Sequence, residues 1–221
     1  MPHKRKNLNI VGPNLWYLVG LITSDGCLSK DGRQVDITAS DYYYLSTLKE
    51  TLGLSNRVTN KHGLNGRLSH HIQFANREFY DFLISIGLTP RKSLTLKSLK
   101  IDENYFHDFL RGLIDGDGCI RRWFHPTNYN QQWSLRIYSG SQKFLEWTKN
   151  VVEKLYGAQG RLHQEKKYPT KNALKYGKMA AREILKKCYY DGAFALERKA
   201  RLARSCVNSY KGWSKSKTVF A

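Results

Sequence analysis

The chain has 221 residues, 41% of them hydrophobic and 13% aromatic, which is enough for a packed core and excludes a disordered tail. Lysine and arginine number 37 against 18 aspartate and glutamate, giving a formal net charge of +19 that favours a polyanionic partner, most often nucleic acid. No apolar run reaches membrane-spanning length and the start has no apolar signal core, so we expect no membrane partner. We expect a soluble intracellular protein, in the cytoplasm or nucleoid or in an organelle.

The first half predicts five elements in chain order. Helical spacing covers 13–24, and a hairpin with an Asp-Gly turn covers 27–39. A second helix over 41–53 ends at a glycine, a second hairpin covers 57–75, and a third helix covers 77–87.

The second half repeats this order. A helix over 103–116 follows Asp102, a good N-cap, and strands over 119–124 and 133–139 flank a polar loop at 125–132. A helix over 141–157, strands over 161–168 and 173–177, and a helix over 180–190 complete it. The fold class is therefore α+β, with two pseudo-symmetric αββαββα domains. The domains are expected at 1–87 and 102–206, joined by a linker at 88–101 and followed by a basic tail at 207–221.

One short stretch occurs in both halves: GLITSDGC at 20–27 and GLIDGDGC at 112–119 are identical at six of eight positions. Residues four apart share a helix face, so each helix presents two small residues on one stripe. Such stripes let two helix backbones approach closely. They predict a helix interface made by Gly20, Ser24, Gly112 and Gly116. The four cysteines form no C-x-x-C pair, which argues against a zinc site, and we expect Cys27 and Cys119 to be small buried residues.

Asp25 and Asp117 fall in the last turn of these two helices, where the helix end is already partly negative. Two helices packed in parallel would bring both carboxylates together, and a hard cation such as Mg²⁺ would neutralise them. Beside phosphate, such a site hydrolyses phosphodiester bonds. A single copy of the stretch is more simply a packing and turn device. Two copies in a basic, duplicated chain favour the metal site.

The stretches Leu18–Gly26 and Leu110–Gly118 closely resemble the LAGLIDADG motif of homing endonucleases. The resemblance implies a monomer whose two saddle-shaped antiparallel sheets form a groove for the DNA major groove. It implies that Asp25 and Asp117 are catalytic metal ligands, that Ser24 and Gly116 offer backbone carbonyls, and that Mn²⁺ or Ca²⁺ can replace Mg²⁺ in binding. Basic residues near the scissile phosphates correspond to Lys92 and Lys199.

The sequence departs from the family pattern where many members carry a glutamine near the attacking water. The corresponding positions are Ala39 or Ser40 in one half and Ser139 in the other. The polar partner of that water is therefore open. The first acidic position of the motif is Thr23 in one copy and Asp115 in the other, and the family picture points it away from the metals.

Alternation along the strands predicts which side chains face DNA. The expected DNA-binding residues are Arg33, Gln34, Asp36, Thr38, Arg57, Thr59, Lys61, Ser69, His71, Gln73, Arg121, Arg136, Tyr138, Arg161, His163 and Lys175. Because the two halves differ at these positions, the target is expected to be asymmetric.

The leading hypothesis is a Mg²⁺-dependent, site-specific endonuclease that cuts both strands of double-stranded DNA. Two alternatives remain open. The first is a maturase that binds intron RNA on the same fold, and the second is a DNA-binding regulator without catalysis.

Overall fold

The computed structural model describes residues 10–63, 66–164 and 172–209. The N-terminal half contains α1 (Gly12–Asp25), β1 (Gly26–Leu28), β2 (Gln34–Ala39), α2 (Tyr42–Thr51), β3 (Val58–His62), β4 (Leu68–Ala75) and α3 (Arg77–Ser85). The C-terminal half contains the 3₁₀ turn η1 (Glu103–Tyr105), α4 (Phe106–Asp117), β5 (Gly118–Phe124), β6 (Gln131–Ser139), α5 (Gln142–Tyr156), β7 (Arg161–Gln164), β8 (Asn172–Tyr176), α6 (Lys178–Cys188) and α7 (Glu197–Asn208).

The predicted α+β class and the repeated order of helix, hairpin, helix, hairpin and helix are confirmed. Helix α7 was not predicted, and it packs against α6 and the start of the second sheet. It runs to Asn208, so the tail predicted from 207 begins as helix; the tail from 210 onward lies outside the described residues. The segment 88–101 contains neither helix nor strand.

Each half forms one antiparallel four-stranded sheet, in the order β1-β2-β4-β3 and β5-β6-β8-β7. The predicted inward positions of the central strands are buried: Val35, Ile37, Ile72, Phe74, Leu135, Ile137, Leu174 and Tyr176. Alternation places Leu68, the first residue of β4, and Leu162, on the edge strand β7, on the same inward faces, but they are 45% and 36% exposed. Burial of this alternating set fixes which face of each sheet points away from the helices.

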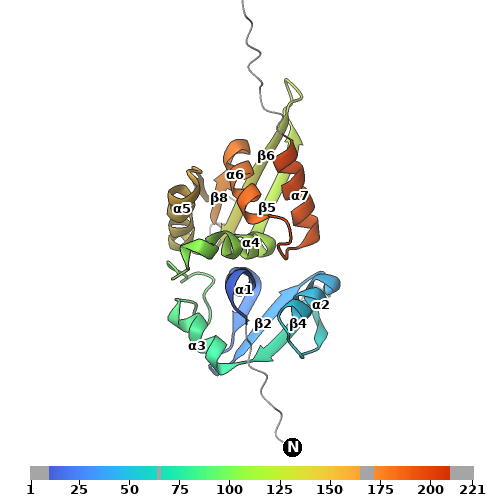
Figure 1. Cartoon of the computed structure of the whole chain (residues 1–221), viewed down its shortest axis with the longest axis vertical. Coiled ribbons are helices and arrows are strands. Elements are labelled where there is room, and N and C mark those ends of the chain that lie inside the picture. The colour runs from blue at the N-terminus through green and yellow to red at the C-terminus, as the bar shows by residue number, and fades with distance from the viewer. Residues whose placement is uncertain (1–9, 64–65, 165–171, 210–221) are drawn as a thin grey trace, which may run out of the picture.

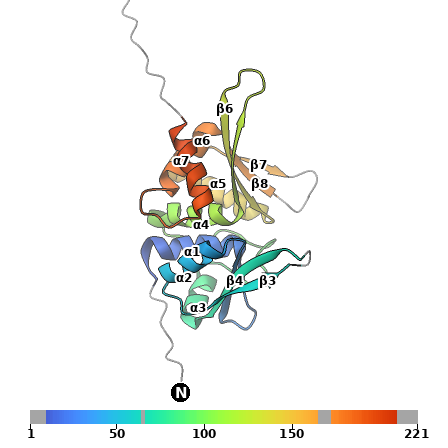
Figure 2. The same ribbon diagram turned by 90° about the vertical axis from the view of Figure 1, so that its right-hand side faces the viewer.

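Helices α1 and α4 lie against each other between the two halves, and the other helices cover one face of each sheet (Figure 1). The view in Figure 2 shows the same two lobes from the side, with the β5–β6 hairpin projecting beyond the C-terminal lobe. The described helices include none that is long and apolar enough to cross a membrane.

Asp102 accepts a hydrogen bond from Asn104 N at 2.9 Å, which confirms it as the N-cap of the helical segment that starts at Glu103; the first turn, η1, is 3₁₀ and α4 follows from Phe106. Two local expectations were wrong. The β5–β6 ladder continues to the pair Phe124↔Gln131, so the loop between these strands is shorter than predicted. Cys27 and Cys119 are exposed, because strand alternation after a glycine turns them away from the core.

Candidate active site

The close contact of α1 and α4 depends on glycine. A Cβ atom on Gly20 would collide with the Phe109 carbonyl and lie 2.9 Å from Leu113 N, and one on Gly112 would collide with the Tyr17 carbonyl. A Cβ on Gly116 would collide with Ser24 on the opposite helix. The structure therefore brings together the four residues predicted for the helix interface, which we call the glycine seam: Gly20, Ser24, Gly112 and Gly116.

The seam brings the ends of the two helices together. Asp25 is the last residue of α1 and Asp117 the last residue of α4; we call them the acidic pair. A Cβ on Gly116 would lie 3.1 Å from Asp25 Oδ2, so the Asp25 carboxylate reaches the end of α4. Burial, and next the negative charge of Asp117, raise the pKa of Asp25 to about 6. The two carboxylates are therefore close enough to repel each other.

A buried lysine lies at the end of each motif helix. Lys199, 3% exposed, donates from Nζ to the carbonyls of Ile114 at 2.6 Å, Asp115 at 2.6 Å and Gly116 at 2.9 Å. Lys92, 7% exposed, donates from Nζ to the Gly26 carbonyl. The Ile114 carbonyl also accepts from Gly118 N, and the carbonyls at the end of α4 carry the negative end of the helix dipole. Each lysine thus caps a motif helix beside the acidic pair.

The two lysines act across the seam. Among the cations near Asp25, Lys199 lowers its pKa most, ahead of Lys92 and Arg198. Lys92 interacts more strongly with Asp117 than with Asp25. Burial lowers the pKa of both ammonium groups, that of Lys199 to about 8, and the acidic residues offset part of this shift. Each carboxylate therefore lies within electrostatic reach of the lysine from the other half, which we call the crossed arrangement of the lysines.

A small cavity of about 60 Å³ opens beside Asp25. Its lining includes Ala39, Ser40, Tyr44, Gly116 and Arg198. The positions where the family pattern expects glutamine, Ala39 or Ser40, therefore border this cavity, which has room for water. Arg198, which is exposed, was not predicted as a site residue. The Arg-Lys pair occurs in both halves, as Arg91-Lys92 and Arg198-Lys199, and this repetition is a signal that could have identified it.

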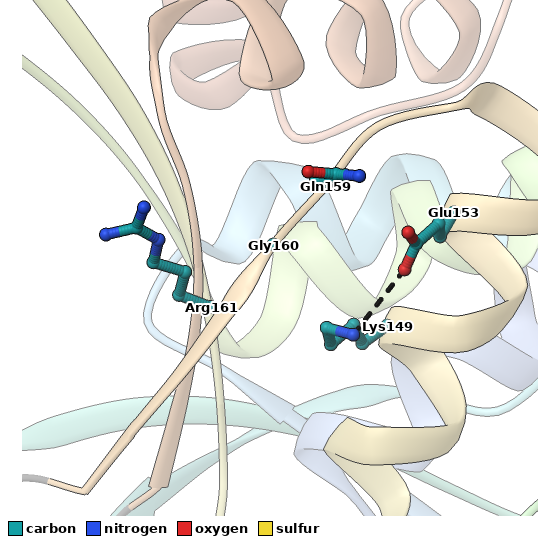
Figure 3. Close-up of a pocket in the computed structure, with 5 residues that line it drawn as sticks. All are labelled: Lys149, Glu153, Gln159, Gly160 and Arg161. Atoms are coloured by element: carbon teal, nitrogen blue, oxygen red, sulfur yellow. Dashed lines mark hydrogen bonds and ion pairs between the residues drawn. The ribbon is translucent and has the colours of Figure 1, made fainter.

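A larger hollow, of about 470 Å³, lies between α5 and the start of β7 and is lined by Lys149, Glu153, Gln159, Gly160 and Arg161. Lys149 pairs with Glu153 at 3.5 Å, and the Arg161 side chain points away from that pair (Figure 3). Because this hollow holds one internal ion pair and neither member of the acidic pair, it offers no comparable chemistry.

The donor atoms at the acidic pair are all oxygens, from two carboxylates and the nearby carbonyls of Ser24 and Gly116. Oxygen donors supplemented by water suit Mg²⁺, and a divalent cation would relieve the repulsion that raises the pKa of Asp25. The Gly116 carbonyl accepts from Lys199, but a carbonyl oxygen has a second lone pair. The described residues contain no cluster of three or more His, Cys, Asp or Glu side chains arranged to hold a metal, so such an ion would need carbonyl and water ligands.

On the first sheet, the predicted DNA-facing side chains contact one another. Asp36 accepts from Thr38 at 3.0 Å, bonds His71 Nδ1 at 2.6 Å and lies 3.8 Å from Lys61 Nζ. Gln73 donates to Gln34 at 2.8 Å. Asp36 therefore orders its neighbours on this face. Of the other predicted residues, Thr59 and Ser69 lie on the paired strands β3 and β4, Arg57 precedes β3, and Arg33 lies in the β1–β2 turn bonded to Asp31.

On the second sheet, the predicted residues form a basic row. Arg136 pairs in register with Lys175, and Lys175 pairs with Arg161 on the next strand. Like charges placed directly opposite each other repel, which a polyanion lying on the row would relieve. Arg121 on β5 lies opposite Ser134, which is two residues from Arg136 along β6. Ala173 on β8 lies between Tyr138 on β6 and His163 on β7.

Solved structures provide a comparison. The homing endonuclease I-WcaI, bound to its DNA recognition sequence, matches with a TM-score of 0.61 at 12% identity, covering 86% of this chain and 85% of that chain. The homing endonuclease I-DmoI in complex with DNA and Ca matches with a TM-score of 0.56 at 15% identity, covering 87% and 97%. The fold is that of the LAGLIDADG homing endonucleases.

Another solved structure with this fold is full-length DUF199/WhiA from Thermatoga maritima, with a TM-score of 0.57 and 16% identity. It aligns with 93% of this chain, which spans only 64% of the length of DUF199/WhiA. No protein-family model matches the sequence, and no curated protein matches it significantly. At these identities the likeness establishes the fold alone.

Proposed function

We propose that the chain is a site-specific, Mg²⁺-dependent endonuclease that acts as a monomer and cuts both strands of double-stranded DNA. The observation that carries this proposal is the meeting of Asp25 and Asp117 at the joined ends of α1 and α4, with a buried lysine at each helix end. The glycine seam already brings the two helices into backbone contact.

In the proposed site, Asp25 and Asp117 with the carbonyls of Ser24 and Gly116 would hold Mg²⁺. A bound Mg²⁺ polarises a phosphoryl oxygen and lowers the pKa of a water. Lys92 and Lys199 would stabilise the charge that develops on the phosphate. The cavity beside Asp25, bordered by Ser40 and Arg198, would hold the water close to that phosphate.

The two sheets would contact the duplex on either side of the acidic pair. The basic row Arg136, Lys175 and Arg161 would contact phosphates or guanine edges, whereas the Asp36 network presents His71 and Lys61 in fixed positions. These different surfaces support an asymmetric target. Two neighbours of the same fold are DNA complexes, one of them with Ca, which supports duplex DNA and a divalent metal as partners.

A second candidate is a DNA-binding protein without nuclease activity. It is favoured by one observation: the Lys199 ammonium binds the Gly116 carbonyl, which leaves a single lone pair of that oxygen for a metal.

The deciding experiment is a cleavage screen of a randomised duplex library with Mg²⁺, followed by sequencing of cut ends. We expect double-strand cuts at one extended site, lost in both Asp25→Asn and Asp117→Asn while both variants still bind the selected DNA. Asp81→Asn, which changes an exposed carboxylate on α3, is the matched control and should cleave normally. Selective binding with no cut by the parent protein would support the second candidate instead, and full cleavage by either variant would overturn the metal assignment.

A further inference from the structure

One face of α4 carries three buried charged residues. Asp108, Arg111 and Asp115 follow the spacing that places side chains on a single helix face, and they are 0%, 0% and 3% exposed. We call this set the α4 polar face. Charged side chains are almost never buried this completely without partners. Most of their partners lie in the segment 188–196, which joins α6 to α7.

The first two residues hold the beginning and middle of that segment. Arg111 donates from Nε to the Phe194 carbonyl and from Nη1 to the Cys188 carbonyl, both at 2.9 Å. Its Nη1 also pairs with Asp108 Oδ1 at 2.8 Å, and the same oxygen accepts from the Tyr190 hydroxyl at 2.8 Å. Arg111 therefore fixes backbone at two places, and Asp108 holds Arg111 in position.

Asp115 holds the end of the segment, where α7 begins. Its carboxylate accepts from the Tyr189 hydroxyl at 2.7 Å, the Leu196 backbone N–H at 2.7 Å and the Tyr17 hydroxyl at 2.8 Å. Leu196 is the N-cap residue of α7, and its carbonyl accepts from Lys199 N at 2.8 Å. Fixing Leu196 therefore sets the point from which the Lys199 side chain reaches the carbonyls of α4.

The equivalent face of α1 carries no charge. Its residues at the same places in the repeat are Trp16, Val19 and Thr23, and the Thr23 hydroxyl donates to the Val19 carbonyl of its own helix at 2.7 Å. The α4 polar face is therefore not a requirement of helix packing in this fold. It is a local feature of the half that contains α7.

We infer that Asp115 is a positioning residue: by fixing Leu196 it places Lys199, and with it Arg198, beside Asp25. This inference rests on the proposed function for its effect on catalysis, but the docking of Leu196 and Lys199 can be tested without any cleavage. Asp115 also lines the cavity beside Asp25, and it acts on Lys199 through the backbone at the start of α7.

The first test is hydrogen exchange of the metal-free protein, comparing Asp115→Thr, which copies Thr23, with the parent. Peptides covering 189–199 should exchange at least about tenfold faster, while peptides covering 88–96 around Lys92 should not change. Asp115→Asn keeps one acceptor for Leu196 N and should restore most of the protection. Thr23→Val is the matched control on α1 and should leave both peptides unchanged.

The second test is single-turnover cleavage with each strand followed separately. Asp115→Thr should slow one strand about 10- to 100-fold, the same strand that Lys199→Met slows, with DNA affinity unchanged. Tyr189→Phe, which removes one hydrogen bond and keeps the ring, should act on the same strand by less.

The outcomes separate the two proposals. Faster exchange at 189–199 in a protein that cuts no DNA supports the docking role and overturns only the proposed function. Unchanged exchange in Asp115→Thr, or an equal slowing of both strands, overturns the positioning role. Should Asp115→Thr not fold, Tyr189→Phe and Asp115→Asn decide the matter by the same two readouts.

Discussion

Lys92 and Lys199 occupy corresponding places at the ends of α1 and α4, but the chain holds them by different means. Lys92 follows Arg91, whose φ of 59° is a left-handed conformation that non-glycine residues seldom adopt. The residues after it pack across the molecule: Ser141 Oγ donates to the Leu96 carbonyl, and a Cβ on Gly140 would lie 2.7 Å from the Ser93 carbonyl.

Lys199 instead lies in the first turn of α7, a helix that its own half supports through the α4 polar face. A lysine is thus held at each helix end, in one half by a turn that packs across the two halves and in the other by a buried polar network. The duplication fixes the geometry at the two helix ends, whereas the structure behind each lysine has diverged.

The largest expected effect is a loss of stability when the buried polar network on α4 is broken, compared with a matched change on α1. Arg111→Leu leaves the Asp108 carboxylate buried without its cation, so we expect the free energy of unfolding to fall by about 3–5 kcal/mol in urea titrations. Val19→Ala, at the matched place on α1, removes only apolar contacts and should cost roughly 2 kcal/mol. A smaller loss for Arg111→Leu than for Val19→Ala would mean that the polar face contributes little to the C-terminal half.

Substitutions in the glycine seam should lower the stability equally whether they are made on α1 or on α4. In Gly20→Ala and Gly112→Ala the new methyl group meets backbone atoms of the opposite helix, so each should cost on the order of 3 kcal/mol in thermal or urea unfolding. Gly177→Ala adds a methyl group in open space and should cost less than about 1 kcal/mol. Markedly unequal losses for the two seam variants would show that the halves do not share the interface evenly.

The crossed arrangement of the lysines predicts opposite strand preferences. Lys92→Met and Lys199→Met keep the apolar stem and remove the ammonium group, and each should slow cleavage of a different strand about 100-fold. Strand-resolved denaturing gels would measure this, with exposed Lys97→Met as the control. Slowing of the same strand by both variants would contradict the crossed pairing.

The smallest effect concerns the acidic pair itself. In the metal-free protein, NMR titration of Asp25 should give a pKa of about 6, and this pKa should fall in Asp117→Asn, where burial still raises it and the nearby cations still lower it. In the parent protein, Asp25 binds more protons in the folded state than in an unfolded chain, where its pKa is 3.8. The contribution of Asp25 to the free energy of unfolding should therefore decline as pH rises from about 4 to about 6. If the pKa of Asp25 does not change in Asp117→Asn, the two carboxylates do not interact electrostatically.

Sequence reasoning was sufficient for the parts of the molecule that follow local periodicity. Alternation placed Val35, Ile37, Leu135 and Ile137 in the cores, and the i, i+4 spacing of small residues identified the seam. The repeat also located the acidic pair, because identical stretches at corresponding places have corresponding positions in space.

The missed features depend on contacts between distant segments. Nothing local marks α7 as the support of Lys199, because its docking is decided by Asp115, some 80 residues earlier in the chain. The spacing of Asp108, Arg111 and Asp115 was visible, but charges on a helix are usually solvated, and only the arrival of segment 188–196 buries them. Asp36 fits alternation on the sheet face, yet its bond to His71 required the register of β2 with β4.

The glycine seam also has a consequence for any cut that the protein makes. Backbone rests directly on backbone at Gly20 and Gly112, so no rotamer change can move the two helix ends apart. For an endonuclease, the stagger between the two broken strands is then set by main-chain geometry alone. Side chains on the sheets can diversify to read new sequences while the length of the overhang stays the same.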